Sequence, residues 1–223
     1  MNDSSIDYAD LAEYDRRQRG IERHLLAAFL GGFVVGLAGM FVAGWGPGWV
    51  GRLYDPYVYL ALSLAVGATA SGFGWALLTT FLAAAATLVA AMGASGFGGD
   101  PAFDVIGGSA AGLNWTIALL VGLGLLAYAT RRGDIWGDLA AGAIGVALMA
   151  DVVNRATSNF AGGDLPSWPG PAALMGLASV AAVFALRSRA RGHLHALALS
   201  AVFAGLSMVC LAALLSGWIP LTV

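Results

Sequence analysis

The sequence predicts an all-α, polytopic transmembrane helical bundle of about seven spans, with a cytoplasmic N-terminus and an extracytoplasmic C-terminus. Its composition is 59% hydrophobic and only 11% charged, with a mean hydropathy of +0.78, whereas roughly a quarter of the residues in a soluble domain carry charge. Because a span needs about 20 residues, a chain of 223 residues has room for roughly six to eight crossings and for no separate soluble domain.

The N-terminal residues 1–24 are expected to form a cytoplasmic juxtamembrane segment, followed by a single transmembrane domain over residues 25–218. The first apolar run begins at Leu25 and is preceded by acidic residues as well as arginines, which is not the pattern of a signal peptide. Within this segment Glu13 with Arg17 and Asp15 with Arg19 are spaced i,i+4 with the acid first, which favours a short helix.

The longest uncharged stretch, residues 56–99, is too long for one crossing. As a helix it would extend roughly 65 Å, against a hydrocarbon core of about 30 Å. Ser71, Gly72 and Gly74 offer the one plausible break. We therefore expect two spans, 57–73 and 75–93, joined by a tight uncharged bend.

The other expected spans are 25–45, 112–130, 137–156, 171–187 and 194–217. Seven spans with the N-terminus inside place most loop arginines on the cytoplasmic side, as the positive-inside rule requires. The inside arginines would be Arg131, Arg132, Arg187, Arg189 and Arg191, and the outside ones Arg52 and Arg155. A single span over 56–99 would move Arg131 and Arg132 outside.

Small residues predict helix contacts. Gly32 and Gly36 form a Gly-x-x-x-Gly pair, and Gly67 with Ser71 forms a looser version of it. Gly142 and Gly145 reduce the width of the helix expected at 137–156, so that a neighbouring helix can approach it closely.

The candidate polar site lies in the span at 137–156. Asp151 follows Asp138 by about 20 Å of helix, and Asn154 and Arg155 lie one turn further on. A carboxylate at this depth needs a partner or must become neutral. We expect a site for an ion, a proton or a small polar solute, with Asn114 contributing from the span at 112–130. The alternative is a structural ion pair between Asp151 and Arg155.

A cofactor or metal site is not expected. His24 and either His193 or His195 fall at the inner ends of the first and last spans and could ligate haem, but interfacial polar caps are the simpler interpretation. The single cysteine, Cys210, lies in an apolar run and supplies no zinc-ligand set.

Several function classes are excluded by missing residues. The sequence has no phosphate-binding Gly-Lys-Ser/Thr loop, no His-Glu-x-x-His helix and no Gly-x-Ser-x-Gly elbow. It has no lysine for a retinal Schiff base, and its net charge of −2 does not indicate nucleic acid. We expect no enzyme activity.

The expected function is that of a small transporter or the membrane component of one. A non-catalytic accessory or scaffold subunit of a larger membrane complex is the alternative, and a haem-binding redox subunit is the third possibility. The expected partners are the lipid bilayer and other membrane subunits or further copies of the chain. Eleven arginines without a lysine favour a GC-rich prokaryotic genome, and hence the plasma membrane of a prokaryote.

Overall fold

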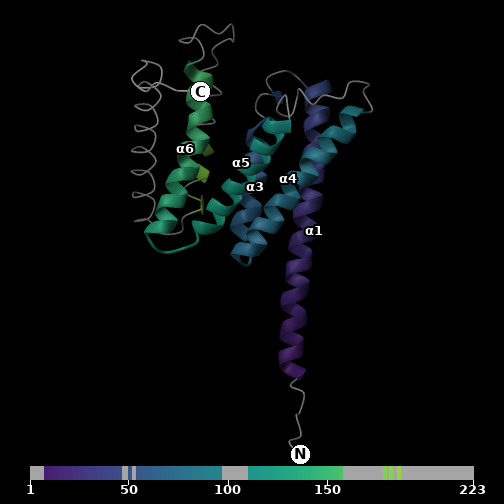
Figure 1. The fold of residues 1–223 in the computed structure, drawn as a ribbon, viewed down its shortest axis with the longest axis vertical. Coiled ribbons are helices and arrows are strands. Elements are labelled where there is room, and N and C mark those ends of the chain that lie inside the picture. Colours follow the sequence, from purple (N-terminus) through teal and green to yellow (C-terminus); the bar gives the residue numbers. More distant parts are fainter. Residues whose placement is uncertain are drawn as a thin grey trace, which may run out of the picture. The chain divides into compact units, whose positions relative to one another are not determined.

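The computed structural model describes residues 8–46, 50–51, 54–96, 110–157, 178–179, 181–182 and 185–186. Its principal elements are α1 (Tyr8–Trp45), α3 (Tyr57–Thr69), α4 (Phe73–Gly96), α5 (Ala110–Ala129) and α6 (Ile135–Thr157) (Figure 1). The part of the chain that the structure describes contains no strand, so the predicted all-α class is confirmed there. The chain divides into two compact units, Met1–Leu125 and Leu126–Val223, which are described separately below.

Among the described residues, three helices are long and apolar enough to cross a membrane, over Glu13–Trp45, Phe73–Gly93 and Gly112–Ala129. The protein is therefore a membrane protein. Shorter apolar helical segments lie at Tyr57–Thr69, which is α3, and at Ile135–Leu148 within α6. The predicted spans at 112–130 and 137–156 correspond within two residues to α5 and α6, whereas those at 171–187 and 194–217 lie almost wholly outside the described residues.

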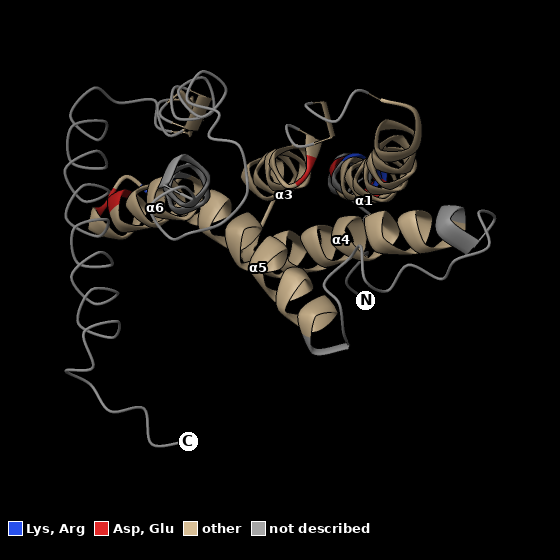
Figure 2. Ribbon diagram, turned by 90° about the horizontal axis from the view of Figure 1, so that it is seen from above, with Lys and Arg blue, Asp and Glu red and all other residues tan. Residues whose placement is uncertain are grey.

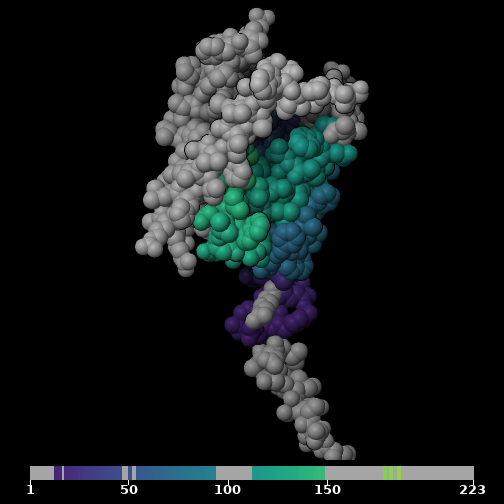
Figure 3. Space-filling view, turned by 60° about the vertical axis from the view of Figure 1, so that its left-hand side comes forward, coloured from purple at the N-terminus to yellow at the C-terminus, as the bar shows by residue number. Residues whose placement is uncertain are grey.

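The first helix, α1, joins the predicted juxtamembrane segment and the first span without a break. Its 38 residues extend about 57 Å, so its charged N-terminal part projects beyond α3 and α4 (Figures 1 and 3). Asp15 and Arg19 are 3.6 Å apart there, which confirms that predicted pair; the side chain of Arg17 lies outside the described residues. By contrast, α4 and α5 carry no charged residue (Figure 2).

The predicted break in the long uncharged stretch is confirmed, although its position differs slightly from the prediction. The first of the two helices, α3, ends at Thr69, because Ala70 turns to an extended backbone with φ −63° and ψ 144°. The carbonyl of Gly72 accepts a 2.8 Å hydrogen bond from the Ala76 amide, so α4 begins directly after Gly72. Gly74, predicted to be part of the bend, instead lies in the first turn of α4.

The closest packing in the first unit joins α1 to α4. A methyl group added at Gly32 would overlap the main-chain carbonyl of Ala83, and one added at Gly36 would overlap that of Thr87. The Thr87 hydroxyl donates a hydrogen bond of 3.0 Å to the carbonyl of Gly32. The predicted role of Gly32 and Gly36 in helix contact is confirmed, since only glycine lets the two backbones approach this closely.

A second close crossing joins α3 to α5. Gly67 packs on the backbone of Gly124, and the hydroxyl of Ser63, one turn before Gly67, donates a 2.5 Å hydrogen bond to the carbonyl of Leu120. The prediction had paired Gly67 with Ser71, which is wrong because Ser71 is exposed in the bend. The small pair at this crossing is therefore Ser63 and Gly67.

These contacts fix the relative directions of α1, α3, α4 and α5. Gly32 and Gly36 meet Ala83 and Thr87 in the same order along the chain, so α1 and α4 are parallel. Contacts of Ser63 with Leu120 and Gly67 with Gly124 make α3 and α5 parallel as well. The tight bend makes α3 and α4 antiparallel, so each helix in the series α1, α3, α4 and α5 reverses the direction of the one before it.

Candidate functional site

Three of the four residues of the candidate polar site lie on α6. Asp151, Asn154 and Arg155 occupy its last two turns, which end at Thr157. A spacing of i, i+3 and i+4 brings the three positions to one side of a helix. The side chains of these residues lie outside the described part of the structure, so an ion pair between Asp151 and Arg155 stays a prediction.

Asn114, the fourth candidate, is exposed in the second turn of α5. It belongs to the first unit, whereas Asp151 belongs to the second. The contribution of Asn114 to a site shared with Asp151 therefore also stays a prediction.

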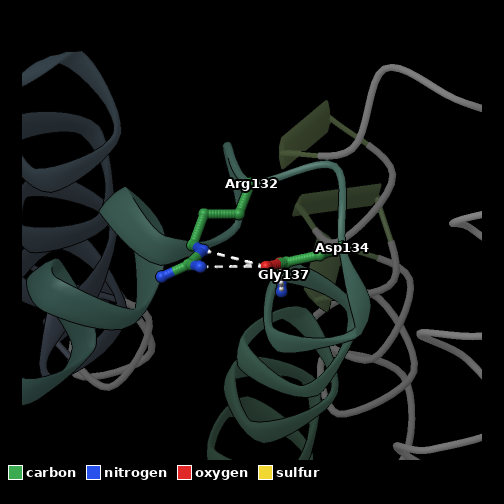
Figure 4. A network of polar contacts seen from close by, with 3 residues as sticks. All are labelled: Arg132, Asp134 and Gly137. Atoms are coloured by element: carbon green, nitrogen blue, oxygen red, sulfur yellow. Dashed lines mark hydrogen bonds and ion pairs between the residues drawn. The ribbon is translucent and has the colours of Figure 1, made fainter.

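The start of α6 is held by a polar cluster formed from Arg132, Asp134 and Gly137 (Figure 4). The amide of Gly137 donates a hydrogen bond to Oδ1 of Asp134 at 3.2 Å, which is the geometry of a helix N-cap. The Nε and Nη2 atoms of Arg132 lie 3.1 and 3.0 Å from Oδ2 of the same carboxylate. Asp134 is thereby fixed at the positive end of the helix dipole.

The ionisation of Asp134 follows from these contacts. Desolvation acts to raise the pKa of its carboxyl, but hydrogen bonds from Gly137 and Arg132 and the positive charge of Arg132 oppose it. The net result is a pKa below the usual range for aspartate. The cluster therefore holds a charged carboxylate where α6 begins and serves to fix the helix end.

Buried hydroxyl groups are a feature that the sequence analysis missed. Ser63, Thr79, Thr80 and Thr87 are all buried, and each donates a hydrogen bond to a main-chain carbonyl. The signal was present, because serine and threonine in apolar helices are common where membrane helices touch. Since a hydroxyl has one proton, these bonds leave the four groups no donor for a bound solute.

No metal centre emerges from the part of the chain that the structure describes, which has no group of three or more His, Cys, Asp or Glu side chains able to hold an ion. One imidazole is notable: Nε2 of His24 on α1 is buried and has no hydrogen-bond partner among the described residues. Its suggested haem partners, His193 and His195, lie outside the described residues, as does Cys210.

No protein-family model, curated protein or solved structure matches this chain. Its function is therefore inferred from its own residues and geometry.

Proposed function

We propose that the chain is a multi-pass protein of a prokaryotic plasma membrane and that it acts as a small transporter, or as the membrane component of one, through a polar site at Asp151. The observation that carries this proposal is the continuity of α6 from Ile135 to Thr157. A continuous helix carries Asp151 about 20 Å along the axis from Asp138. An ionisable residue at such a depth is costly and marks ion or solute pathways in membrane proteins.

The packing of the first unit supports a multi-pass topology. Successive helices that reverse direction are what a chain crossing a bilayer repeatedly requires. With the charged start of α1 inside, the bend at residues 70–72 is also inside, because α4 is parallel to α1. The C-terminal end of α5 then points to the same side as the end of α3, which makes Arg131 and Arg132 cytoplasmic, in accord with the positive-inside rule.

The described helices of the first unit offer little chemistry for a transported solute. Its buried hydroxyls donate to carbonyls, and the glycines at its two closest crossings face backbone atoms of the neighbouring helix. Such close packing suits a rigid scaffold for the rest of the protein. We therefore place the polar residues that bind an ion or a proton on α6.

A flux assay in proteoliposomes tests the proposal. Asp151→Asn keeps the shape of the side chain and removes its charge, so it should abolish ion-driven or pH-driven flux without loss of folded protein. Asp55→Asn, which changes an exposed carboxylate before α3, is the matched control and should leave flux unchanged. Normal flux in a well-folded Asp151→Asn protein would contradict the transport site.

The alternative role of Asp151 is structural, and a double variant separates it from transport. If Asp151 only pairs with Arg155, removing one charge destabilises the bundle and removing both restores its stability. Asp151→Asn with Arg155→Gln should therefore recover the melting temperature in detergent if the pair is structural. Under the transport proposal, flux stays absent in the double variant.

The accessory-subunit alternative is favoured by one specific observation. Large apolar side chains of α1 are exposed along much of its apolar length, namely Leu26, Phe29, Leu30, Phe33, Val34, Phe41 and Trp45. Lipid or a neighbouring membrane subunit would cover such a surface. A wild-type protein that carries no flux alone, but co-purifies with a fixed ratio of another membrane subunit, would support this second function.

The third candidate, a haem-binding redox subunit, is favoured only by Nε2 of His24, which has no hydrogen-bond partner among the described residues. We expect no Soret absorption from the purified protein or after addition of haem. A stoichiometric Soret band that disappears in a His24→Ala variant would instead support the redox function.

A further inference from the structure

The connection between α5 and α6 places cationic and apolar side chains next to one another on its surface. Arg131 and Arg132 are exposed, and Ile135 and Trp136, which begin α6, are 67% and 63% exposed. Large apolar side chains and arginines exposed together at the end of a membrane helix are typical of the layer where lipid headgroups meet water.

The arginines are held in defined positions by their neighbours. The guanidinium of Arg131 lies over the ring of Tyr128, 5.8 Å from its centroid, and Arg132 is paired with the Asp134 carboxylate. Main-chain hydrogen bonds from the amides of Arg131 and Arg132 to the carbonyls of Tyr128 and Ala129 close the turn. The two guanidinium groups are therefore presented from a short ordered turn.

The exposed charge of this turn favours an anion. Residues 130–138 carry two guanidinium groups and two carboxylates, but Asp138 is buried and Asp134 already accepts hydrogen bonds from Gly137 and Arg132. A guanidinium has five N–H donors in a fork that matches phosphate oxygens. Phosphodiester groups of anionic lipids lie at the depth that exposed Trp136 would occupy.

From this juxtaposition we propose that Arg131, Arg132 and Trp136 form a binding site for the headgroup of an anionic phospholipid in the cytoplasmic leaflet. The arginines bind the phosphodiester, and the indole of Trp136 lies beside the glycerol region. The site is separate from the proposed polar site at Asp151 and its occupancy does not depend on transport, but its place in the cytoplasmic leaflet rests on the proposed topology.

Native mass spectrometry of the full chain in detergent, with added phosphatidylglycerol or phosphatidylcholine, tests the site. Wild-type protein should retain phosphatidylglycerol more strongly than phosphatidylcholine. Because one arginine near a membrane surface contributes about 1 kcal/mol, Arg131→Gln should weaken phosphatidylglycerol retention about fivefold. Arg16→Gln, which removes an exposed arginine from the charged part of α1, is the matched control and should have no effect.

Two further arms identify the ligand. Trp136→Ala should weaken retention of both lipids, because the indole contacts the part that they share, while inorganic phosphate at equal concentration should not displace phosphatidylglycerol. Equal retention of the two lipids, or equal losses in Arg131→Gln and Arg16→Gln, would overturn the proposal. Displacement by inorganic phosphate would show a phosphate site in place of a lipid site.

Discussion

The Thr87 hydroxyl links α4 to α1 through a hydrogen bond. It donates to the carbonyls of both Gly32 on α1 and Ala83 on α4, at 3.0 and 2.9 Å. Valine has nearly the same shape without the hydroxyl, so Thr87→Val should lower the free energy of unfolding by about 0.6 kcal/mol, a common value for hydrogen bonds between membrane helices. Unfolding in mixed micelles measures this effect.

Thr69→Val is the control for that change. The hydroxyl of Thr69 bonds only to carbonyls of its own helix, Ala65 and Val66, at 2.7 and 3.2 Å. Its loss should therefore have little effect on stability. Equal destabilisation by the two variants would show that the contact between α1 and α4 contributes nothing through Thr87.

The stability of the folded protein should depend on pH through the carboxyl group of Asp134 at the start of α6. Because the pKa of its carboxyl is lower in the folded protein than in the unfolded chain, its charge stabilises the fold above the ordinary pKa of about 4. That stabilisation is lost as the pH falls through the lower, folded-state value. The melting temperature of the wild type should exceed that of Asp134→Asn at neutral pH, and the difference should shrink in acid. A difference that is independent of pH would contradict this role.

At the scale of whole elements, the crossing of α1 and α4 should tolerate no side chain larger than hydrogen at its centre. A methyl group at Gly32 would meet the backbone of Ala83, which cannot rotate away. Gly32→Ala should therefore destabilise the protein by about 1–3 kcal/mol, the usual cost of overpacking. Gly44→Ala in the same helix has open space around the new methyl group and should be close to neutral in the same unfolding assay. Equal effects would contradict the observed crossing.

The described helices could be predicted largely from the sequence. The limits of the apolar runs can be read from it directly, and the thickness of the bilayer sets the length of each span. The bend near Ser71 and Gly72 followed from the same length argument, and Gly32 and Gly36 from their spacing. Which residues meet where two helices cross could not be predicted. Ala70 ends α3 one turn before the expected position, so Ser71 lies outside the helix and Ser63 is the small residue that packs beside Gly67. Register of this kind depends on tertiary packing.

At the scale of the whole molecule, charge placement predicted the direction of each crossing, and the packing of α1, α3, α4 and α5 has the same alternation. The candidate site was less accessible to sequence reasoning. Asp151, Asn154 and Arg155 could be placed on one helix face from their spacing, but a contribution from Asn114 requires contact between distant segments, which no local pattern encodes.

We propose that the chain crosses the bilayer at each of these helices, with the bend at residues 70–72 on the cytoplasmic side. The most direct test of this proposal is labelling of single cysteines by a membrane-impermeant maleimide in a Cys210→Ala background. Cysteine at Ser95, near the end of α4, should react in intact cells, whereas cysteine at Gln18 or Ser71 should react only after the membrane is permeabilised. Labelling of Ser71→Cys and Ser95→Cys from the same side would contradict the account.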